Sequence, residues 1–88
     1  MRDFKAGDKA VHFKRGFLSE EELKKEPNKY IYEIIGKATD SETGEPLMVY
    51  RAEYGEKTIF VRPYNDFFSE TDIEKYPNAK QKYRFEKL

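Results

Sequence analysis

Apolar and polar positions alternate along most of this chain, in short runs that Gly, Asp, Asn or Pro interrupt, and this pattern predicts strands. The runs are rich in aromatic and β-branched residues. We predict strands over residues 9–14, 30–38, 46–54, 57–63 and 82–87. The pattern therefore predicts a mainly β fold of about five antiparallel strands.

Two segments carry the signals that start and stop short helices. Ser19 lies three residues before Glu22, which is the spacing of a capping box, and Pro27 ends the segment. Residues 69–78 have the same Ser-Glu start and Lys-x-Pro-Asn end, so we predict a second short helix there, before the last strand. We interpret the likeness as shared start and stop chemistry rather than an internal repeat, because the flanking strands do not match.

The segment Tyr54–Lys57 fits a two-residue hairpin, because Gly55 occupies the first central position of a type II′ turn. This turn predicts a register in which Tyr50 faces Val61. One face of the hairpin is then apolar and belongs to the core: Met48, Tyr50, Ala52, Ile59 and Val61. The opposite face is mixed: Val49, Arg51, Glu53, Thr58, Phe60 and Arg62.

Composition and charge fit one small folded domain over residues 1–88. Seven Tyr and seven Phe argue against disorder, although 39% of the residues are charged. Seventeen basic and seventeen acidic residues give a formal net charge of zero, so no overall field attracts nucleic acid or an anionic membrane. The start of the chain lacks the apolar run of a signal peptide, and no segment approaches membrane-spanning length. We expect a cytoplasmic protein without membrane contact.

Few residues offer catalytic or metal-binding chemistry. The chain has no cysteine and one histidine, His12, so we expect no disulfide, no thiol nucleophile, no metal site and no cofactor. Strand alternation places His12 opposite Val11 and Phe13, on an outer or rim face, and favours a hydrogen-bonded structural histidine. No Ser lies in a Gly-x-Ser-x-Gly setting, and the five glycines are scattered singly, so we predict no catalytic residues and no phosphate-binding loop.

The mixed hairpin face carries the most suggestive cluster, Arg51, Phe60 and Arg62. Arginines beside an exposed aromatic ring can hold phosphates, stack on bases or clamp an acidic peptide. A structural alternative stays open, in which the arginines form cross-strand ion pairs and Phe60 fills a minor core. The basic and aromatic segment Lys14–Phe17 could extend the same surface.

The chain also carries four motifs in order and a closing Arg-Phe pair: His12-Phe13-Lys14, Ala38-Thr39-Asp40-Ser41-Glu42-Thr43, Val49-Tyr50-Arg51-Ala52-Glu53-Tyr54, Val61-Arg62-Pro63 and Arg84-Phe85. In these motifs it resembles the bacterial domain of unknown function 1653 family over most of its length. The resemblance implies a small SH3-like barrel and implies no activity. Asp40 stands where the family usually has a His, and residues 17–29 look like a helical insertion relative to compact members.

We predict a non-enzymatic binding module, either a monomer or a weak homodimer, that recognises a protein or peptide. The residues that would bind the partner are Arg51, Phe60, Arg62, His12 and Lys14. The alternative is a single-stranded nucleic-acid binding domain, against which the neutral net charge counts. A third hypothesis is a small enzyme or catalytic accessory domain, which a deep pocket enclosing His12, Asp40 and an arginine would favour.

Overall fold

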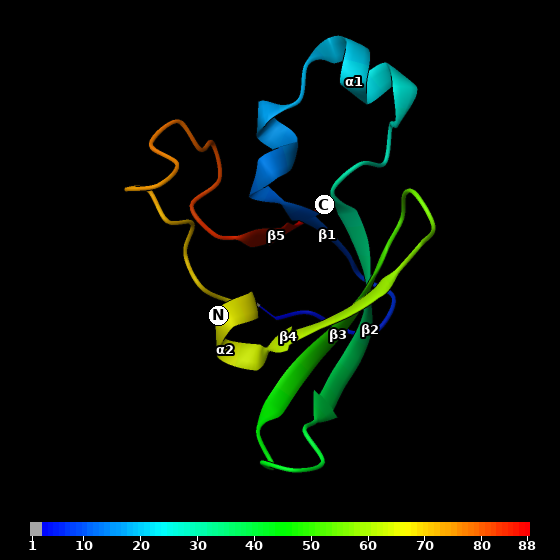
Figure 1. The fold of residues 1–88 in the computed structure, drawn as a ribbon, viewed down its shortest axis with the longest axis vertical. Coiled ribbons are helices and arrows are strands. Elements are labelled where there is room, and N and C mark those ends of the chain that lie inside the picture. Colours follow the sequence, from blue (N-terminus) through cyan, green and yellow to red (C-terminus); the bar gives the residue numbers. More distant parts are fainter. Residues whose placement is uncertain (1–2) are drawn as a thin grey trace.

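A computed structural model describes residues 3–88 (Figure 1), and Met1 and Arg2, with which the predicted domain begins, lie outside the described residues. Within this range one antiparallel sheet contains five strands, in the spatial order β4-β3-β2-β1-β5. The strands are β1 (Lys9–His12), β2 (Ile31–Thr39), β3 (Pro46–Ala52), β4 (Ile59–Pro63) and β5 (Phe85–Lys87). The prediction of a mainly β fold with five antiparallel strands is confirmed.

Three short helical segments lie between the strands: the 3-10 helix η1 (Phe13–Phe17) and the α-helices α1 (Glu20–Lys25) and α2 (Tyr64–Phe67). The capping box predicted for α1 is present. Ser19 Oγ accepts the Glu22 N–H at 3.2 Å, and Glu22 Oε1 accepts the Ser19 N–H at 3.0 Å. No residue of α1 is buried, so this helix projects from the sheet without contributing to the core.

The helix predicted over residues 69–78 is wrong, because these residues form turns. The Asp72 carboxylate accepts the N–H groups of Glu74 and Lys75, which starts a single turn. Pro77 follows before a second turn can form, since proline cannot donate the hydrogen bond that helix propagation needs. Helix α2 forms earlier in the chain, directly after β4.

The core lies on one face of the sheet, which we call the inner face, and α2 packs against it. Its buried residues are Phe4, Ala10, Tyr32, Ile34, Met48, Tyr50, Ala52, Phe67 and Phe85. Phe67 of α2 stacks on Phe85 of β5 with ring centroids 4.2 Å apart. This contact joins the segment after β4 to the opposite edge of the sheet.

Strands β4 and β5 are the two edges of the sheet, and their side chains meet although the strands do not pair. The Arg62 Cζ atom on β4 lies 5.9 Å from the centroid of the Phe85 ring on β5. No strand pairing joins β4 to β5 within residues 3–88, so the sheet stays open. The SH3-like barrel that the family resemblance implies is therefore not confirmed. We call the opening between these two edges the seam.

The predicted register of the β3–β4 hairpin is wrong by one residue. Tyr54 and Lys57 do close a turn, in which the Lys57 N–H donates to the Tyr54 carbonyl at 3.1 Å and Gly55 has a φ of 60°. The next bond inward joins the Ala52 N–H to the Thr58 carbonyl, at 2.9 Å. Between these two bonded pairs the β3 side has one additional residue, Glu53, and the β4 side has none. Such an additional residue on one strand is a β-bulge.

A one-residue slip moves every side chain of a strand to the other face of the sheet. Arg51 pairs with Ile59, and both lie on the outer face. Ile59 and Val61, which the predicted register places in the core, are 60% and 59% exposed. Phe60 and Arg62 turn to the inner face instead. The predicted face that combines Arg51 with Phe60 and Arg62 does not exist.

Candidate functional site

A cleft lies along the seam, at the inner face of the sheet. It consists of two adjoining cavities of about 290 Å³ and about 160 Å³, which share His12, Lys14 and Arg62. The larger one, here called the cationic cavity, is completed by Phe13, Asp72, Lys75, Tyr76 and Arg84. The smaller one, the aromatic cavity, is completed by Tyr30, Tyr32, Tyr50, Phe60 and Phe85. Together they form the seam cleft.

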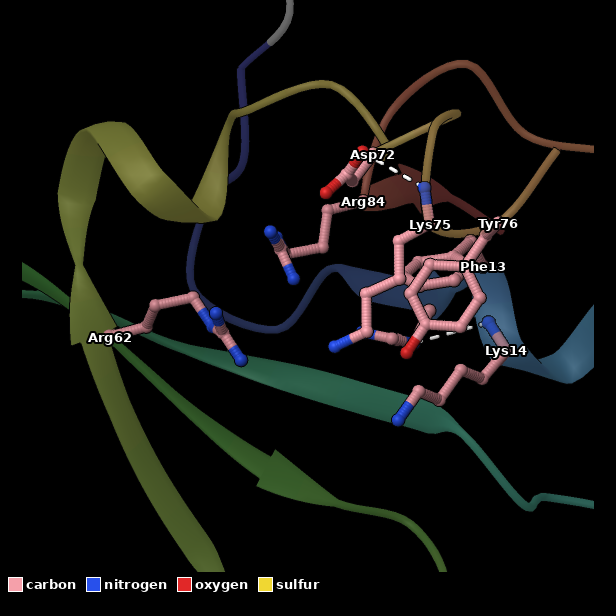
Figure 2. A pocket seen from close by; sticks show the side chains of 8 residues that line it. Phe13, Lys14, Arg62, Asp72, Lys75, Tyr76 and Arg84 are labelled. Carbon is pink, nitrogen blue, oxygen red and sulfur yellow. Dashed lines mark hydrogen bonds between the residues drawn. The ribbon is translucent and has the colours of Figure 1, made fainter. Parts of the chain in front are cut away.

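Four basic side chains reach the cationic cavity from four parts of the chain: Arg62 from β4, Lys14 from η1, Lys75 from the turn after Asp72, and Arg84 from the residue before β5. Figure 2 shows their nitrogen-bearing ends pointing into the same space. Side chains that are far apart in the sequence thus meet at the seam, because the two edges of the sheet approach each other there.

These cations are only partly neutralised by acidic residues. Arg62 Nη1 pairs with Asp66 at 2.7 Å. The ion pairs within residues 3–88 include none of Lys14, Lys75 and Arg84. Arg84 donates from Nε to the Ser69 hydroxyl at 3.3 Å, which leaves its terminal nitrogens as donors for a ligand.

Among residues 3–88, Asp72 is the one carboxylate that lines the cationic cavity. Its Oδ1 atom accepts the backbone N–H groups of Glu74 and Lys75, so it serves the turn that carries Lys75. Four cations and one carboxylate therefore surround the cationic cavity, in a chain whose formal net charge is zero. A cavity with this imbalance of charge attracts anions.

His12 lies at the junction of the two cavities and is 8% exposed. The expectation that it occupies an outer or rim face is wrong. Strand β1 turns Ala10 and His12 inward, and an inward Ala-His pair gives no apolar signal in the sequence. The His12 ring packs against Phe13 and Phe85, with centroids 4.5 Å and 4.9 Å away. The expectation of a hydrogen-bonded histidine is confirmed, because Nδ1 accepts the Lys14 N–H at 3.2 Å.

The electrostatic surroundings keep His12 uncharged. Burial, and then the charges of Lys14, Arg62 and Arg84, lower the pKa of His12 from 6.5 to about 4. At pH 7 the imidazole is neutral. Because Nδ1 accepts a hydrogen bond, the proton resides on Nε2. His12 thus adds an uncharged N–H donor to the cleft.

Aromatic packing holds the turn that carries Lys75. The Tyr76 ring packs on the buried Phe13 ring with centroids 4.8 Å apart, nearly edge to face at 60°. This contact fixes residues 72–76 against η1. It thereby positions Lys75 beside Lys14.

The aromatic cavity offers ring faces and hydroxyl groups. Phe60 is 40% exposed and stacks at 25° on the buried Tyr50 ring. The Tyr50 hydroxyl accepts a bond from Arg62 Nε at 3.3 Å, and the hydroxyls of Tyr32 and Tyr54 lie 3.0 Å apart. Burial raises the pKa of Tyr32, so its hydroxyl stays protonated. A planar ligand with polar edges would find both kinds of contact here.

Four of the five binding residues predicted from the sequence line the seam cleft: His12, Lys14, Phe60 and Arg62. Arg51 does not join them, because it lies on the outer face, as predicted, while the hairpin slip turns Phe60 and Arg62 to the inner face. On the outer face the Arg51 Nη2 atom pairs with Glu33 at 2.5 Å. For Arg51, the structural alternative of a cross-strand ion pair is therefore the correct one.

Sequence reasoning missed Lys75, Tyr76 and Arg84. Arg84 belongs to the closing Arg-Phe pair of the family resemblance, so a signal for it existed. Lys75 and Tyr76 lie in the segment predicted as a helix and carry no signal of their own. Their place in the cleft depends on the single turn that begins at Asp72.

Other candidate chemistry lies elsewhere or is not formed. Asp40 is in the β2–β3 connection, where its carboxylate accepts the N–H groups of Glu42 and Thr43. Neither of the two cavities that His12 lines contains Asp40, so these cavities are not the pocket that would favour an enzyme. Within residues 3–88 no group of three His, Asp or Glu side chains is placed to hold a metal ion. None of the helices in that range has the length and apolarity to cross a bilayer.

The chain belongs to the family described as "protein of unknown function (DUF1653)", whose profile matches residues 9–87. This match confirms the resemblance found in the sequence motifs, and the matched range contains every residue of the seam cleft. Comparisons with curated proteins and with solved structures gave no match.

Proposed function

We propose that this member of the DUF1653 family is a non-catalytic binding domain that captures a phosphate-bearing ligand in the seam cleft. The observation that carries the proposal is the convergence of Lys14, Arg62, Lys75 and Arg84 on one cavity of a chain with no net charge. The proposal keeps the class of binding module and four of the five binding residues that the sequence predicts, and it replaces the protein or peptide partner with a phosphate-bearing ligand.

A phosphate matches this cavity better than a carboxylate does. A phosphate monoester carries a charge of about −1.5 to −2 at pH 7 and offers three acceptor oxygens. A carboxylate offers one charge and two oxygens, which would leave most of the four cations without a partner. The two terminal nitrogens of Arg84 can donate two parallel hydrogen bonds to phosphate oxygens. Arg62 can donate from Nη2, because its Nε and Nη1 atoms are bonded to Tyr50 and Asp66. The neutral Nε2–H of His12 supplies a further donor at the same place.

The composition of the cleft supports binding rather than catalysis. Among the residues 3–88 that line the cleft, none is Ser, Thr or Cys, so the cleft has no aliphatic hydroxyl or thiol nucleophile. His12 would be a weak general base at neutral pH, because its pKa is about 4 and its Nδ1 is occupied by the Lys14 N–H. The Asp72 carboxylate is engaged with backbone N–H groups.

The test is a titration of the intact chain with inorganic phosphate at low ionic strength, followed by calorimetry and by amide shifts in NMR spectra. We expect the largest shifts at Lys14, in the turn 72–76 and at Arg84. The variant Arg84→Gln should bind phosphate at least about 10-fold more weakly, because it loses a charge-assisted contact. No p-nitrophenol should be released from p-nitrophenyl phosphate.

Arg51→Gln is the matched control. Arg51 lies on the same hairpin as Arg62, and the Glu33 ion pair holds it on the outer face. This variant should bind phosphate like the parent chain. The proposal is wrong if phosphate shifts no cleft amide, or if Arg51→Gln weakens binding as much as Arg84→Gln does. Circular dichroism of each variant checks that the fold is retained.

A further inference from the structure

We infer that the ligand of the seam cleft is a single nucleotide, whose phosphate occupies the cationic cavity and whose base occupies the aromatic cavity. The inference rests on the proposed function and adds the class of ligand. It starts from the two halves of the cleft, which differ in chemistry yet share His12, Lys14 and Arg62.

Arg62 connects the two halves. Its Nη1 atom is paired with Asp66 at 2.7 Å, its Nε atom donates to the Tyr50 hydroxyl at 3.3 Å, and its guanidinium lies over the Phe85 ring. The side chain is thus held at the boundary between the cavities. A ligand that fills both halves must carry its anionic group close to a planar, partly polar group. A nucleoside monophosphate has this arrangement.

The aromatic cavity suits a nucleobase. Phe60 presents a 40% exposed ring at the mouth of the cleft, and stacking on such rings tolerates any base. Tyr32 lines the cavity, and its hydroxyl shares one hydrogen bond with the hydroxyl of Tyr54, which is not part of the lining, so Tyr32 keeps further hydrogen-bonding capacity there. The Tyr32 and Tyr50 hydroxyls therefore offer partners for the polar edge of a base.

A phosphotyrosine side chain fits the same cleft less well. Its ring carries no polar atom on its edge besides the phosphate oxygen. It would bury the tyrosine hydroxyls of the aromatic cavity without offering a partner to the donor and acceptor capacity that their existing hydrogen bonds leave open, and such burial is unfavourable. This argument favours a nucleotide over a phosphorylated peptide.

A long nucleic-acid strand is also disfavoured. Proteins that bind single strands follow the backbone with a basic groove that spans several nucleotides. Here the four cations point into one cavity rather than along a track, and the acidic residues of the chain equal the basic ones in number. The charge distribution matches the phosphate of one nucleotide.

The experiment compares Kd values for inorganic phosphate, ribose 5-phosphate, adenosine, AMP and UMP under the same low-salt conditions. We expect AMP or UMP to bind at least about 10-fold more tightly than ribose 5-phosphate, since base–aromatic stacking supplies an effect of this size. Phe60→Ala should remove that gain and leave the binding of ribose 5-phosphate unchanged. Val61→Ala is the matched control, because Val61 is the exposed neighbour on the outer face.

Phe60→Leu separates stacking from apolar contact, because it keeps an apolar side chain and removes the ring. It should lose most of the base-dependent gain while the domain stays folded. Two further probes are a short phosphotyrosine peptide and a ten-nucleotide thymidine strand. AMP or UMP should bind more tightly than the peptide. The apparent affinity for the ten-nucleotide strand should exceed that for UMP by no more than the factor that its ten equivalent nucleotides supply.

The results distinguish the inference from the proposed function. Equal binding of AMP, UMP and ribose 5-phosphate overturns the nucleotide inference and leaves phosphate capture standing. The inference is overturned in favour of a phosphopeptide if the phosphotyrosine peptide binds more tightly than AMP and UMP. It is overturned in favour of a nucleic-acid strand if the affinity for the strand exceeds that for UMP by more than the number of nucleotides explains. Failure of every phosphate probe overturns both, and retention of the base-dependent gain in Phe60→Ala overturns the assignment of the aromatic cavity.

Discussion

At the level of single residues, the neutral state of His12 links the stability of the fold to pH. The folded pKa of about 4 lies below the ordinary value of 6.5, so the unfolded chain takes up this proton first as the pH falls. The contribution of His12 to stability is complete above pH 6.5 and is lost between pH 6.5 and 4. We expect the loss of this contribution to lower the free energy of unfolding, measured in urea, by roughly 3 kcal/mol between pH 6.5 and pH 4.

His12→Gln provides the control for this prediction, because glutamine offers hydrogen-bonding atoms and does not titrate. The variant is expected to be less stable at pH 7, where the imidazole packs against the Phe85 ring. Its free energy of unfolding should change less between pH 6.5 and 4 than that of the parent chain. Equal pH dependence in the two proteins would show that His12 charges freely in the folded state.

The residue scale is also where sequence reasoning about the site was least complete. His12, Lys14 and Arg62 could be selected because they stand in sequence motifs, and Phe60 because the predicted hairpin register groups it with the arginines. Nothing in the sequence separates Lys75 from the other basic residues of the chain. Its role depends on the packing of Tyr76 on Phe13, which is a contact between distant segments.

At the scale of elements, signals within a few residues of sequence predicted the helix and strands that short-range interactions determine. The capping box fixes α1 through bonds between residues three apart, and the alternating pattern located all five strands. The hairpin shows the limit of this approach. Gly55 marks the turn correctly, but the bulge beside it has no sequence signature. One additional residue exchanges the two faces of β4, so an error of one position placed Phe60 and Arg62 opposite the core, whereas Arg51 lies on the outer face in both registers.

Lys57 is the residue through which the hairpin geometry can be tested. It has a φ of 56°, a left-handed conformation that is unfavourable for side chains other than Gly, Asn and Asp. Lys57→Gly should therefore stabilise the domain, by about 0.5–1 kcal/mol in denaturant unfolding. Lys57→Val should destabilise it by about 1–2 kcal/mol, because a β-branched residue is strained at positive φ.

Thr58 gives a comparison for this pair of variants, because it lies next to Lys57 and has no positive φ. Thr58→Gly should destabilise the domain, while Lys57→Gly should not. If Val at position 57 were tolerated as well as Gly, the left-handed turn would not set the register of β3 and β4, and the placement of Phe60 and Arg62 on the inner face would need another cause.

At the scale of the whole molecule, the open sheet and the cleft have one origin. A closed barrel would bury the side chains along the line where β4 and β5 pair. Here these edges stay unpaired, and Arg62 from one edge reaches the Phe85 ring of the other. The sequence indicated five strands but could not decide closure. Closure depends on how far β4 and β5 stand apart, and the stack of Phe67 on Phe85 is a long-range contact that joins the two sides.

The same geometry places like charges close together, so the seam should cost the fold some stability. Lys14→Gln removes one cation that forms no ion pair within residues 3–88. We expect this variant to raise the melting temperature at low ionic strength by about 2–4 °C, which corresponds to relief of about 0.5 kcal/mol of repulsion. The gain should shrink in 0.5 M sodium chloride, because salt screens the repulsion that the variant removes.

Binding and stability should then change in opposite directions. Lys14→Gln is expected to weaken phosphate binding, since the same positive charge that repels Arg62 and Arg84 attracts the anion. Lys24→Gln is the control: it removes an equivalent exposed lysine from α1, which lies outside the seam cleft, and should change neither quantity appreciably. A Lys14→Gln variant that is less stable than the parent at low salt would mean that the cations of the seam are held without mutual repulsion. The excess of positive charge would then not be the property that draws a ligand into the cleft.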